Sequence, residues 1–222
     1  MRIFFIPGFG EDVSIFDKIQ VSVPGEKVFI DNWSLLRELN QKGLTVLVYA
    51  KYITERFQIK KEDVVIGHSM GGWIALYIKQ LSQCRIVQIA SWTDRRKIIM
   101  VPIERHFIYW AAKQGIGFYP WVLHFLIWLH YKNKPSGEIF ARIFERLKKG
   151  NKETVVKQLK VIFHPEKVPV TVTADLRIHA KADHIVKPPD QNFHPVPGDH
   201  FTLYTYPETV YEPILKFLNL RY

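Results

Sequence analysis

A serine between glycines is the residue of this chain most clearly suited to catalysis. Residues 63–73 read Asp-Val-Val-Ile-Gly-His-Ser-Met-Gly-Gly-Trp, so Gly67, Ser69 and Gly71 form a Gly-x-Ser-x-Gly pattern between an apolar run and a helical one. This order predicts a sharp strand-to-helix turn, which needs glycines because its backbone is strained and closely packed. The turn would expose the Ser69 hydroxyl as a nucleophile and leave the Met70 amide at a helix amino terminus. The alternative is a glycine-rich turn with an incidental serine.

A histidine and an aspartate later in the chain supply the partners that such a serine needs. A hydroxyl becomes nucleophilic when a base takes its proton, and a carboxylate must fix the tautomer of that base. His200 follows the last predicted strand, and Asp183 follows the strand before it. Because parallel strands end at one sheet edge, Ser69, Asp183 and His200 are predicted to meet as a catalytic triad. Asp94, which follows another predicted strand, is the competing acid.

Other acids and histidines fit these roles less well. Asp199 adjoins His200, and adjacent side chains in an extended turn point apart. His68 lies inside the serine turn and is expected to pack or to line a pocket. The same holds for three histidines that stand among aromatic residues: His106, His124 and His130.

A second glycine-rich turn is expected to complete an oxyanion hole. Stabilising a tetrahedral oxyanion requires positioned N–H donors. Pro7-Gly8-Phe9-Gly10 follows the first predicted strand, and its glycines would let the Phe9 amide point into the site beside that of Met70. The alternative is that this segment is only a tight turn.

Apolar runs that alternate with helical segments must position these residues. Strands are expected at six runs: Arg2–Ile6, Lys27–Ile30, Asp63–Ile66, Arg85–Ala90, Leu176–Ala180 and Phe193–Val196. Helices are expected at 35–39, 44–57, 72–81 and 208–218, although the β-branched start of the second leaves a strand as its alternative. The alternation predicts an α/β fold, a mostly parallel sheet of about six strands flanked by helices.

The alternation stops between Thr93 and Val168. This stretch contains helix-like segments rich in aromatic and basic residues and no convincing strand. We therefore expect residues 1–92 and 169–222 to form the core domain, with residues 93–168 inserted as a helical cap.

Composition excludes several classes of protein. The 222 residues carry 31 Lys and Arg against 21 Asp and Glu, and 47% are hydrophobic, which is enough to bury a core. The most apolar stretch, 116–129, is shorter than the about 20 residues that cross a bilayer, so no transmembrane segment is expected. Cys84 is the only cysteine, and no Cys/His cluster has zinc-site spacing. We expect a cytoplasmic protein that uses no metal or cofactor.

With these residues placed, the chain resembles the α/β-hydrolase fold superfamily, and within it the small carboxylesterases and acyl-thioester or acyl-carrier-protein esterases. The resemblance rests on the serine turn, the Gly8-Phe9-Gly10 turn and the loops around Asp183 and His200. It implies that Ser69 is the nucleophile, His200 the general base and Asp183 its orienting acid, with the Phe9 and Met70 amides as oxyanion donors. Two features depart from the family: Pro7 stands where a histidine is common, and the first predicted strand corresponds to the family's third, so we expect a sheet trimmed to about six strands.

The cap suggests what the substrate is like. Between Thr93 and Val168, 15 Lys and Arg face six Asp and Glu, so nearly all of the net charge of +10 lies there. Nine aromatic residues fall within 107–131, and Trp110, Trp121 and Trp128 are our candidates for substrate binding. Either the aromatics are the cap's own core beside a solvated basic face, or they form an acyl slot rimmed by charge. A third reading is binding to anionic lipid; nucleic acid is not expected, because no recognised module accompanies the charge.

The sequence thus predicts a serine hydrolase that cleaves a small-molecule carboxylic ester with a short to medium acyl chain. An acyl-CoA or acyl-carrier-protein thioesterase is the first alternative, with the acidic carrier or CoA held by the basic cap. The second is a catalytically silent module of the same fold that binds an acidic partner.

Overall fold

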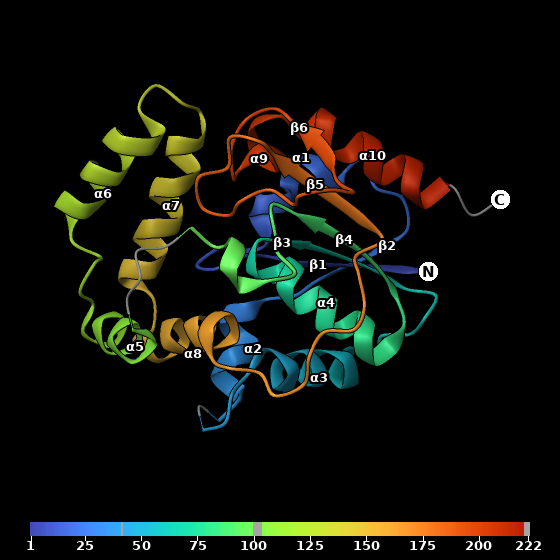
Figure 1. Cartoon of the computed structure of the whole chain (residues 1–222), viewed down its shortest axis with the longest axis horizontal. Helices are drawn as coiled ribbons and strands as arrows, with labels where there is room; N and C mark the ends of the chain where they lie inside the picture. Colours follow the sequence, from blue (N-terminus) through green and yellow to red (C-terminus); the bar gives the residue numbers. More distant parts are fainter. Residues whose placement is uncertain (41, 100–103, 220–222) are drawn as a thin grey trace.

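Six strands form one parallel sheet in the computed structural model, which describes residues 1–40, 42–99 and 104–219. The strands are β1 (Arg2–Ile6), β2 (Glu26–Phe29), β3 (Val64–His68), β4 (Arg85–Ile89), β5 (Leu176–Ala180) and β6 (His194–Val196). Their order across the sheet is β2-β1-β3-β4-β5-β6, and every neighbouring pair is parallel. The predicted α/β fold and number of strands are confirmed (Figure 1).

The central strands are mostly apolar because both faces of the sheet are covered. In β1, Ile3 and Phe5 belong to one hydrophobic cluster, whereas Phe4 and Ile6 belong to the other. Alternate side chains of a strand point to opposite faces, so one short run supplies both cores. All five residues of β3 are buried. This explains why the first three residues of β3, Val64 to Ile66, are all apolar.

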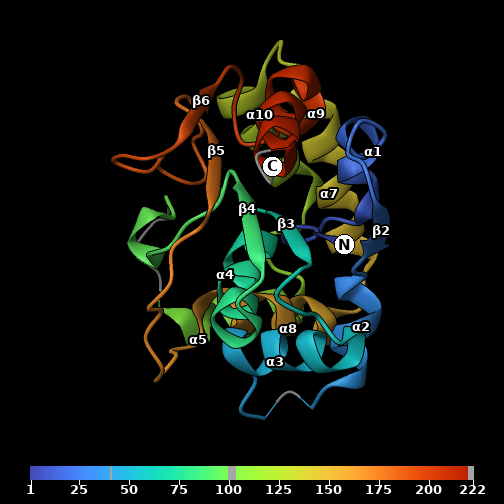
Figure 2. The ribbon, with the colours of Figure 1, turned by 90° about the vertical axis from the view of Figure 1, so that its right-hand side faces the viewer.

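Helices cover the two faces of the sheet, as Figures 1 and 2 show. One face carries α2 (Asn32–Glu38), α3 (Val46–Phe57), α4 (Met70–Ser82) and α8 (Lys152–Phe163), and the other carries α1 (Asp17–Gln20), α9 (Thr202–Thr205) and α10 (Pro207–Asn219). The ambiguous run 44–57 is a helix. Thr45 caps it, because the side chain of this residue accepts a hydrogen bond from the amide of Val48.

Three helical segments stand to one side of the sheet, at the left of Figure 1. They are α5 (Arg105–Gln114), α6 (Pro120–Leu126) with the π-helical turn η3 (Ile127–Tyr131), and α7 (Ser136–Lys149). Helix α8, which also falls within the predicted cap, packs against α2, α3 and α4 as well as α5. The division into a core domain and a cap at residues 93–168 stays a prediction. No helix in the described ranges is both long and apolar enough to cross a bilayer.

Candidate active site

Ser69 occupies the turn between β3 and α4 in a strained backbone conformation. Its φ and ψ are 51° and −118°, a region that L residues rarely adopt and that costs about 1–3 kcal/mol. Neighbouring groups hold the turn: the Ser69 amide donates to the carbonyl of Ile89 at 3.0 Å, and the Ser91 hydroxyl donates to the Ser69 carbonyl at 2.7 Å. Strain maintained by its surroundings is typical of functional sites, and here it lifts the hydroxyl above the sheet edge.

The glycines of this turn are required by close backbone contacts. A Cβ on Gly71 would lie 1.9 Å from the carbonyl oxygen of Ile6, and one on Gly67 would lie 2.3 Å from the backbone of Gly71. Strand β1 and helix α4 can therefore approach each other only because these side chains are missing. The steric reason inferred from the sequence is present in the structure.

The structure brings Ser69, Asp183 and His200 together from three separate loops. The Nε2 atom of His200 lies 3.0 Å from the Ser69 hydroxyl, and its Nδ1 atom lies 2.8 Å from Oδ2 of Asp183. All three residues are buried, at 7%, 5% and 3% exposure in chain order. The imidazole therefore has one nitrogen within proton-transfer reach of the hydroxyl and the other on a carboxylate.

Asp183 is held as a charged acceptor by four donors. Its Oδ1 atom accepts from the amides of Ile185 at 2.8 Å and Val186 at 2.9 Å. Its Oδ2 atom faces His200 and, at 3.1 Å, Nε2 of His179. Burial alone would raise the pKa of this carboxyl, but the two histidines outweigh burial and lower it well below its ordinary value. The carboxylate can therefore orient His200 and stabilise its protonated form.

The turn after β1 is fixed by side chains at three of its backbone groups. The Gly8 amide donates to Glu11 at 2.5 Å, and the Gly10 amide donates to the buried Gln158 at 2.9 Å. The Pro7 carbonyl accepts from Asn32 at 2.9 Å, so the turn keeps its shape without the histidine common at position 7. Within the described residues, the intervening Phe9 amide donates to no protein group.

The Met70 amide is the second candidate oxyanion donor. Met70 is the first residue of α4, where a helix has no internal acceptor for its N–H groups. In the part of the chain that the structure describes, this amide also donates to no other group. The Phe9 and Met70 amides are therefore the candidate donors for a developing oxyanion.

Glu11 and His68 form a buried pair next to Ser69. This pair was not predicted from the sequence. The exposure of these residues is 3% and 0%, and Nδ1 of His68 lies 2.8 Å from a Glu11 oxygen. Burial opposes a charge on His68, but the Glu11 carboxylate outweighs it, so the pKa of His68 is raised above 6.5. The other nitrogen of His68 lies 3.0 Å from the carbonyl of His200. The pair thus connects the turn after β1 to the histidine loop.

A largely apolar cavity of about 270 Å³ opens beside the serine. Its lining comprises Phe9, Glu11, Ser69, Gly117, Phe118, Leu126, Phe140, Ile143, Phe144, Leu147, Ile185, His200 and Phe201. Most of the apolar wall comes from α7 and from the segment before and within α6.

The three tryptophans expected to bind substrate are not part of this lining. Trp110, Trp121 and Trp128 are 50%, 69% and 62% exposed and lie on the outer side of α5, α6 and η3. Phenylalanines of the cap surround the cavity instead. The reason is that α6 is apolar on all sides, so its sequence does not indicate which side turns inward.

The remaining candidates from the sequence lie outside the triad. Asp94 is bonded to the backbone and side chain of Arg96, and Asp199 accepts from Ser136 at 2.6 Å and from the Phe201 amide at 3.1 Å. Neither carboxylate contacts the imidazole of His200. Of the other histidines, His124 and His106 are exposed, and His130 stacks on His184 with ring centroids 4.5 Å apart.

Many basic residues of the cap are already engaged within the protein. Arg146 pairs with Asp12, Lys97 pairs with Asp190, and Lys157 is buried with its Nζ atom 2.9 Å and 2.7 Å from carbonyls at the end of α2. The positive charge counted in the sequence is therefore only partly available to an external partner.

Together these features define the fold: the chain has the α/β-hydrolase fold, with a serine turn, an acid loop and a histidine loop at one sheet edge. Among solved structures it is similar to a hydrolase from Oleispira antarctica, at 14% identity and a TM-score of 0.74, covering 98% of this chain and 90% of the other. It is also similar to an esterase from Exiguobacterium antarcticum, at 11% identity and a TM-score of 0.67, with 98% and 91% covered. A third is a thioesterase from the prodiginine biosynthetic pathway of Streptomyces coelicolor, at 17% identity and a TM-score of 0.60, with 98% and 88% covered.

No protein-family model matches the sequence, and a search of curated proteins also finds no match. At these identities the solved structures establish the fold.

Proposed function

We propose that this protein is a serine hydrolase that cleaves a carboxylic ester of a small molecule. The observation that carries the proposal is the continuous pair of hydrogen-bond contacts, 2.8 Å and 3.0 Å, that joins Asp183, His200 and Ser69. The esterases and hydrolases among the structural neighbours share this fold and support the proposal.

The reaction follows from the position of each group. As the Ser69 oxygen bonds to the acyl carbon, its proton passes to Nε2 of His200, and the carbonyl oxygen becomes an oxyanion that the Phe9 and Met70 amides stabilise. When the bond to the leaving alcohol breaks, His200 returns the proton to that alcohol. Water then attacks the acyl-enzyme with His200 again as base, which releases the acid and restores Ser69. Asp183 stays ionised and stabilises the imidazolium at both stages.

The cavity supports a short to medium acyl chain. An apolar cavity of about 150 Å³ can hold a benzene molecule, so about 270 Å³ accommodates on the order of ten non-hydrogen atoms. Phe140, Ile143 and Phe144 of α7 would contact the chain.

The test is hydrolysis of p-nitrophenyl esters of increasing acyl length by the purified protein. We expect activity to rise from acetate to a maximum between butyrate and octanoate and to fall for longer chains. Ser69→Ala should abolish hydrolysis and labelling by a fluorophosphonate, whereas Ser22→Ala, the matched control outside the site, should leave both unchanged. Activity retained in Ser69→Ala would refute the assigned nucleophile, and a wild-type protein that is neither labelled nor active would favour the catalytically silent alternative.

Thioester hydrolysis is the second candidate, favoured by the structural likeness to the Streptomyces coelicolor thioesterase. The same triad can attack a thioester, and acyl-CoA and p-nitrophenyl esters of equal acyl length would separate the two activities. We do not extend the proposal to an acyl carrier protein, because cap residues such as Arg146 are paired internally.

A further inference from the structure

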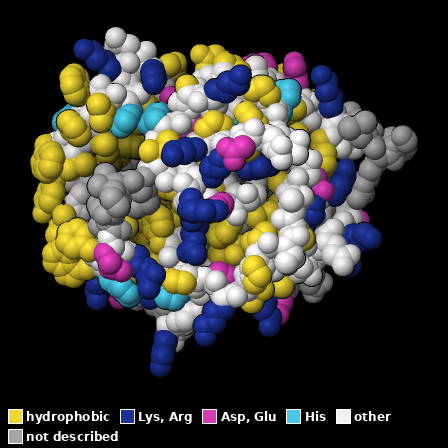
Figure 3. All heavy atoms as spheres, in the orientation of Figure 1, with side chains coloured by type: hydrophobic (Ala, Val, Ile, Leu, Met, Phe, Trp, Pro, Cys, Tyr) yellow, Lys and Arg dark blue, Asp and Glu magenta, His cyan; other side chains and the backbone are white. Residues whose placement is uncertain are grey.

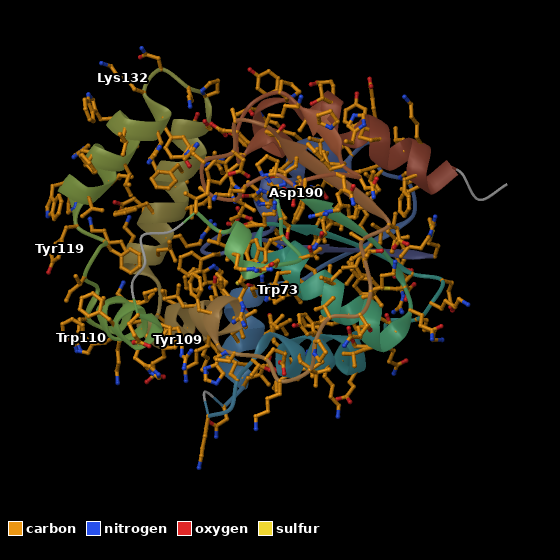
Figure 4. All side chains as sticks on the ribbon, in the orientation of Figure 1. Trp73, Tyr109, Trp110, Tyr119, Lys132 and Asp190 are labelled. Atoms are coloured by element: carbon orange, nitrogen blue, oxygen red, sulfur yellow. The ribbon has the colours of Figure 1, made fainter. Side chains whose placement is uncertain are left out.

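Exposed aromatic side chains are concentrated on the outer side of the cap. Eight of the fifteen exposed large hydrophobic residues in the described ranges lie between positions 107 and 129. We call them the aromatic face: Phe107, Trp110, Ile116, Tyr119, Trp121, Phe125, Trp128 and Leu129. The others are scattered over the chain, and among them only Tyr206 is aromatic. Figure 3 shows hydrophobic side chains gathered over this margin, and Figure 4 shows Trp110 and Tyr119 along it.

Part of this face follows one side of a helix and is exposed. Trp121, Phe125 and Trp128 follow the i, i+4, i+7 spacing of one helix side, and the rings of the last two stack at 6.3 Å. Their exposed fractions are between 52% and 69%. A helix that is apolar on all sides is normally buried. Here Leu126 lines the cavity on the inner side, while the outer side lies in water.

The segment that carries the aromatic face is basic, with the Glu104 carboxylate, which caps α5 beside Phe107, at its start. No Asp or Glu occurs between Arg105 and Gly137, whereas Lys113, Lys132 and Lys134 lie within this stretch. All three lysines are exposed, and among the residues that the structure describes their side chains have no ionic partner. Lys132 lies at the upper end of the cap in Figure 4. Basic residues at the ends of an aromatic surface complement a negatively charged partner.

We propose that the aromatic face binds the surface of an anionic lipid bilayer. Trp and Tyr rings are enriched at the boundary between lipid headgroups and acyl chains, and lysines add attraction to anionic headgroups. A second copy of this chain, whose net charge is +10, would be repelled by these lysines, whereas anionic headgroups would be attracted. Leu126 and Phe118 of the same segment line the cavity. If the protein is the proposed hydrolase, on which this step rests, docking would place its acyl pocket next to lipid and favour lipophilic esters.

The test is flotation with vesicles of pure phosphatidylcholine and of equal parts phosphatidylcholine and phosphatidylglycerol. The protein carries Ser69→Ala, so that binding is measured without hydrolysis. We expect binding to the mixed vesicles that weakens with added salt, and at least about tenfold weaker binding to neutral vesicles. Binding that is equal for both vesicles, or absent from both, overturns the proposal.

Two variants with matched controls locate the contact. The triple variant Trp121→Ser, Phe125→Ser, Trp128→Ser should bind at least about tenfold more weakly. Its control changes three exposed apolar residues of the core to serine, Val21, Val48 and Leu81, and should bind like the parent.

Charge reversal tests the electrostatic part in the same way. Each basic residue near an anionic surface contributes about fivefold to partitioning, so Lys132→Glu with Lys134→Glu should weaken binding at least about 25-fold. Lys60→Glu with Lys61→Glu, at exposed positions of the core, should have little effect. Equal losses in test and control variants overturn the proposal.

A second copy of the chain is the competing occupant of the aromatic face. A dimer in sedimentation that the triple serine variant dissociates, with no vesicle binding, would overturn the lipid proposal. With Ser69 restored, hydrolysis of soluble p-nitrophenyl acetate should be unchanged in all variants. A parent protein that hydrolyses esters but does not bind the mixed vesicles therefore counts against the lipid surface alone, and one that binds these vesicles but hydrolyses no ester counts against the proposed function alone.

Discussion

Asp183→Asn tests the role of the acid, because the structure dictates which way the new amide must face. Oδ1 of Asp183 accepts from two backbone amides, those of Ile185 and Val186, and Oδ2 faces Nδ1 of His200. An asparagine would therefore keep its carbonyl oxygen on the two amides and turn its NH₂ group toward His200. Nδ1 would then have to accept a hydrogen bond, and the proton would move to Nε2. In that tautomer His200 cannot take the proton of Ser69.

The size of the effect follows from the cost of rotating that amide. If the new side-chain amide rotates by half a turn, its oxygen faces His200 and the active tautomer is restored. Its NH₂ group then faces two buried backbone N–H donors, and leaving each of these donors unsatisfied costs about 1–3 kcal/mol. Between about 1 in 30 and 1 in 25,000 molecules would then be active. We therefore expect kcat to fall by about 30-fold to 25,000-fold, a range that contains the about 10⁴-fold loss typical of this substitution in triads, with KM changed little.

The assay is steady-state hydrolysis of p-nitrophenyl butyrate, with urea unfolding of each variant to confirm that it is folded. Asp94→Asn is the control, because Asp94 is the competing acid and its carboxylate contacts Arg96 instead of His200. We expect less than about a twofold change in the control. A folded Asp183→Asn protein with more than a tenth of wild-type kcat, or an Asp94→Asn protein with an equal loss, would refute this reasoning.

Three further predictions concern the supporting structure. Gly71→Ala should lower the free energy of unfolding in urea by at least about 3 kcal/mol, because the new Cβ would meet a backbone oxygen at 1.9 Å. The control Gly137→Ala in α7, whose Cβ would lie 3.4 Å from its nearest neighbour, should change it by less than about 1 kcal/mol. Similar losses for both variants would contradict the steric argument. Because the pKa of His68 is raised in the folded state, the stabilisation from its pair with Glu11 should be full below about pH 6.5 and lost as the pH rises through the folded value. Glu11→Gln should therefore lower the free energy of unfolding more at pH 6 than at pH 9, and an equal or larger effect at pH 9 would count against the charged pair. Ile143→Trp should fill part of the cavity and shift the preferred p-nitrophenyl ester to a shorter chain, and an unchanged chain-length profile would show that the acyl group binds elsewhere.

The positions of the triad could be predicted because they depend on topology. Once the strands before Asp183 and His200 are recognised as parallel neighbours, their loops must end at the edge that carries Ser69. The Gly-x-Ser-x-Gly turn adds a local steric signal that is visible in the sequence. Fold class, strand number and the meeting of these three residues were therefore within reach of the sequence.

The Glu11–His68 pair could not be predicted, because nothing in the sequence distinguishes a buried carboxylate from an exposed one. Glu11 follows a glycine turn, where a solvated acid is the ordinary expectation, and Gln158 reaches Gly10 across 148 positions of sequence. The only available signal was the absence of the usual histidine at Pro7, which leaves the turn in need of other partners.

The orientation of the cap aromatics was beyond the sequence for a different reason. Residues 120–129 are apolar on every side of the helix apart from His124, so hydrophobic periodicity identifies no inner face. Tertiary packing, in which η3 contacts α7, leaves Leu126 in the cavity lining and Trp121 and Trp128 exposed.

The proposed roles of Ser69, Phe9 and Met70 are best tested by a crystal structure of the protein after reaction with a p-nitrophenyl alkylphosphonate. The covalent product of this reaction resembles the tetrahedral intermediate. We predict a covalent bond from phosphorus to the Ser69 oxygen, the phosphonyl oxygen within about 3 Å of the Phe9 and Met70 amides, and the alkyl chain in the cavity beneath α7. A phosphonate bonded to a different residue, or one on Ser69 whose oxygen points away from both amides, would contradict these roles.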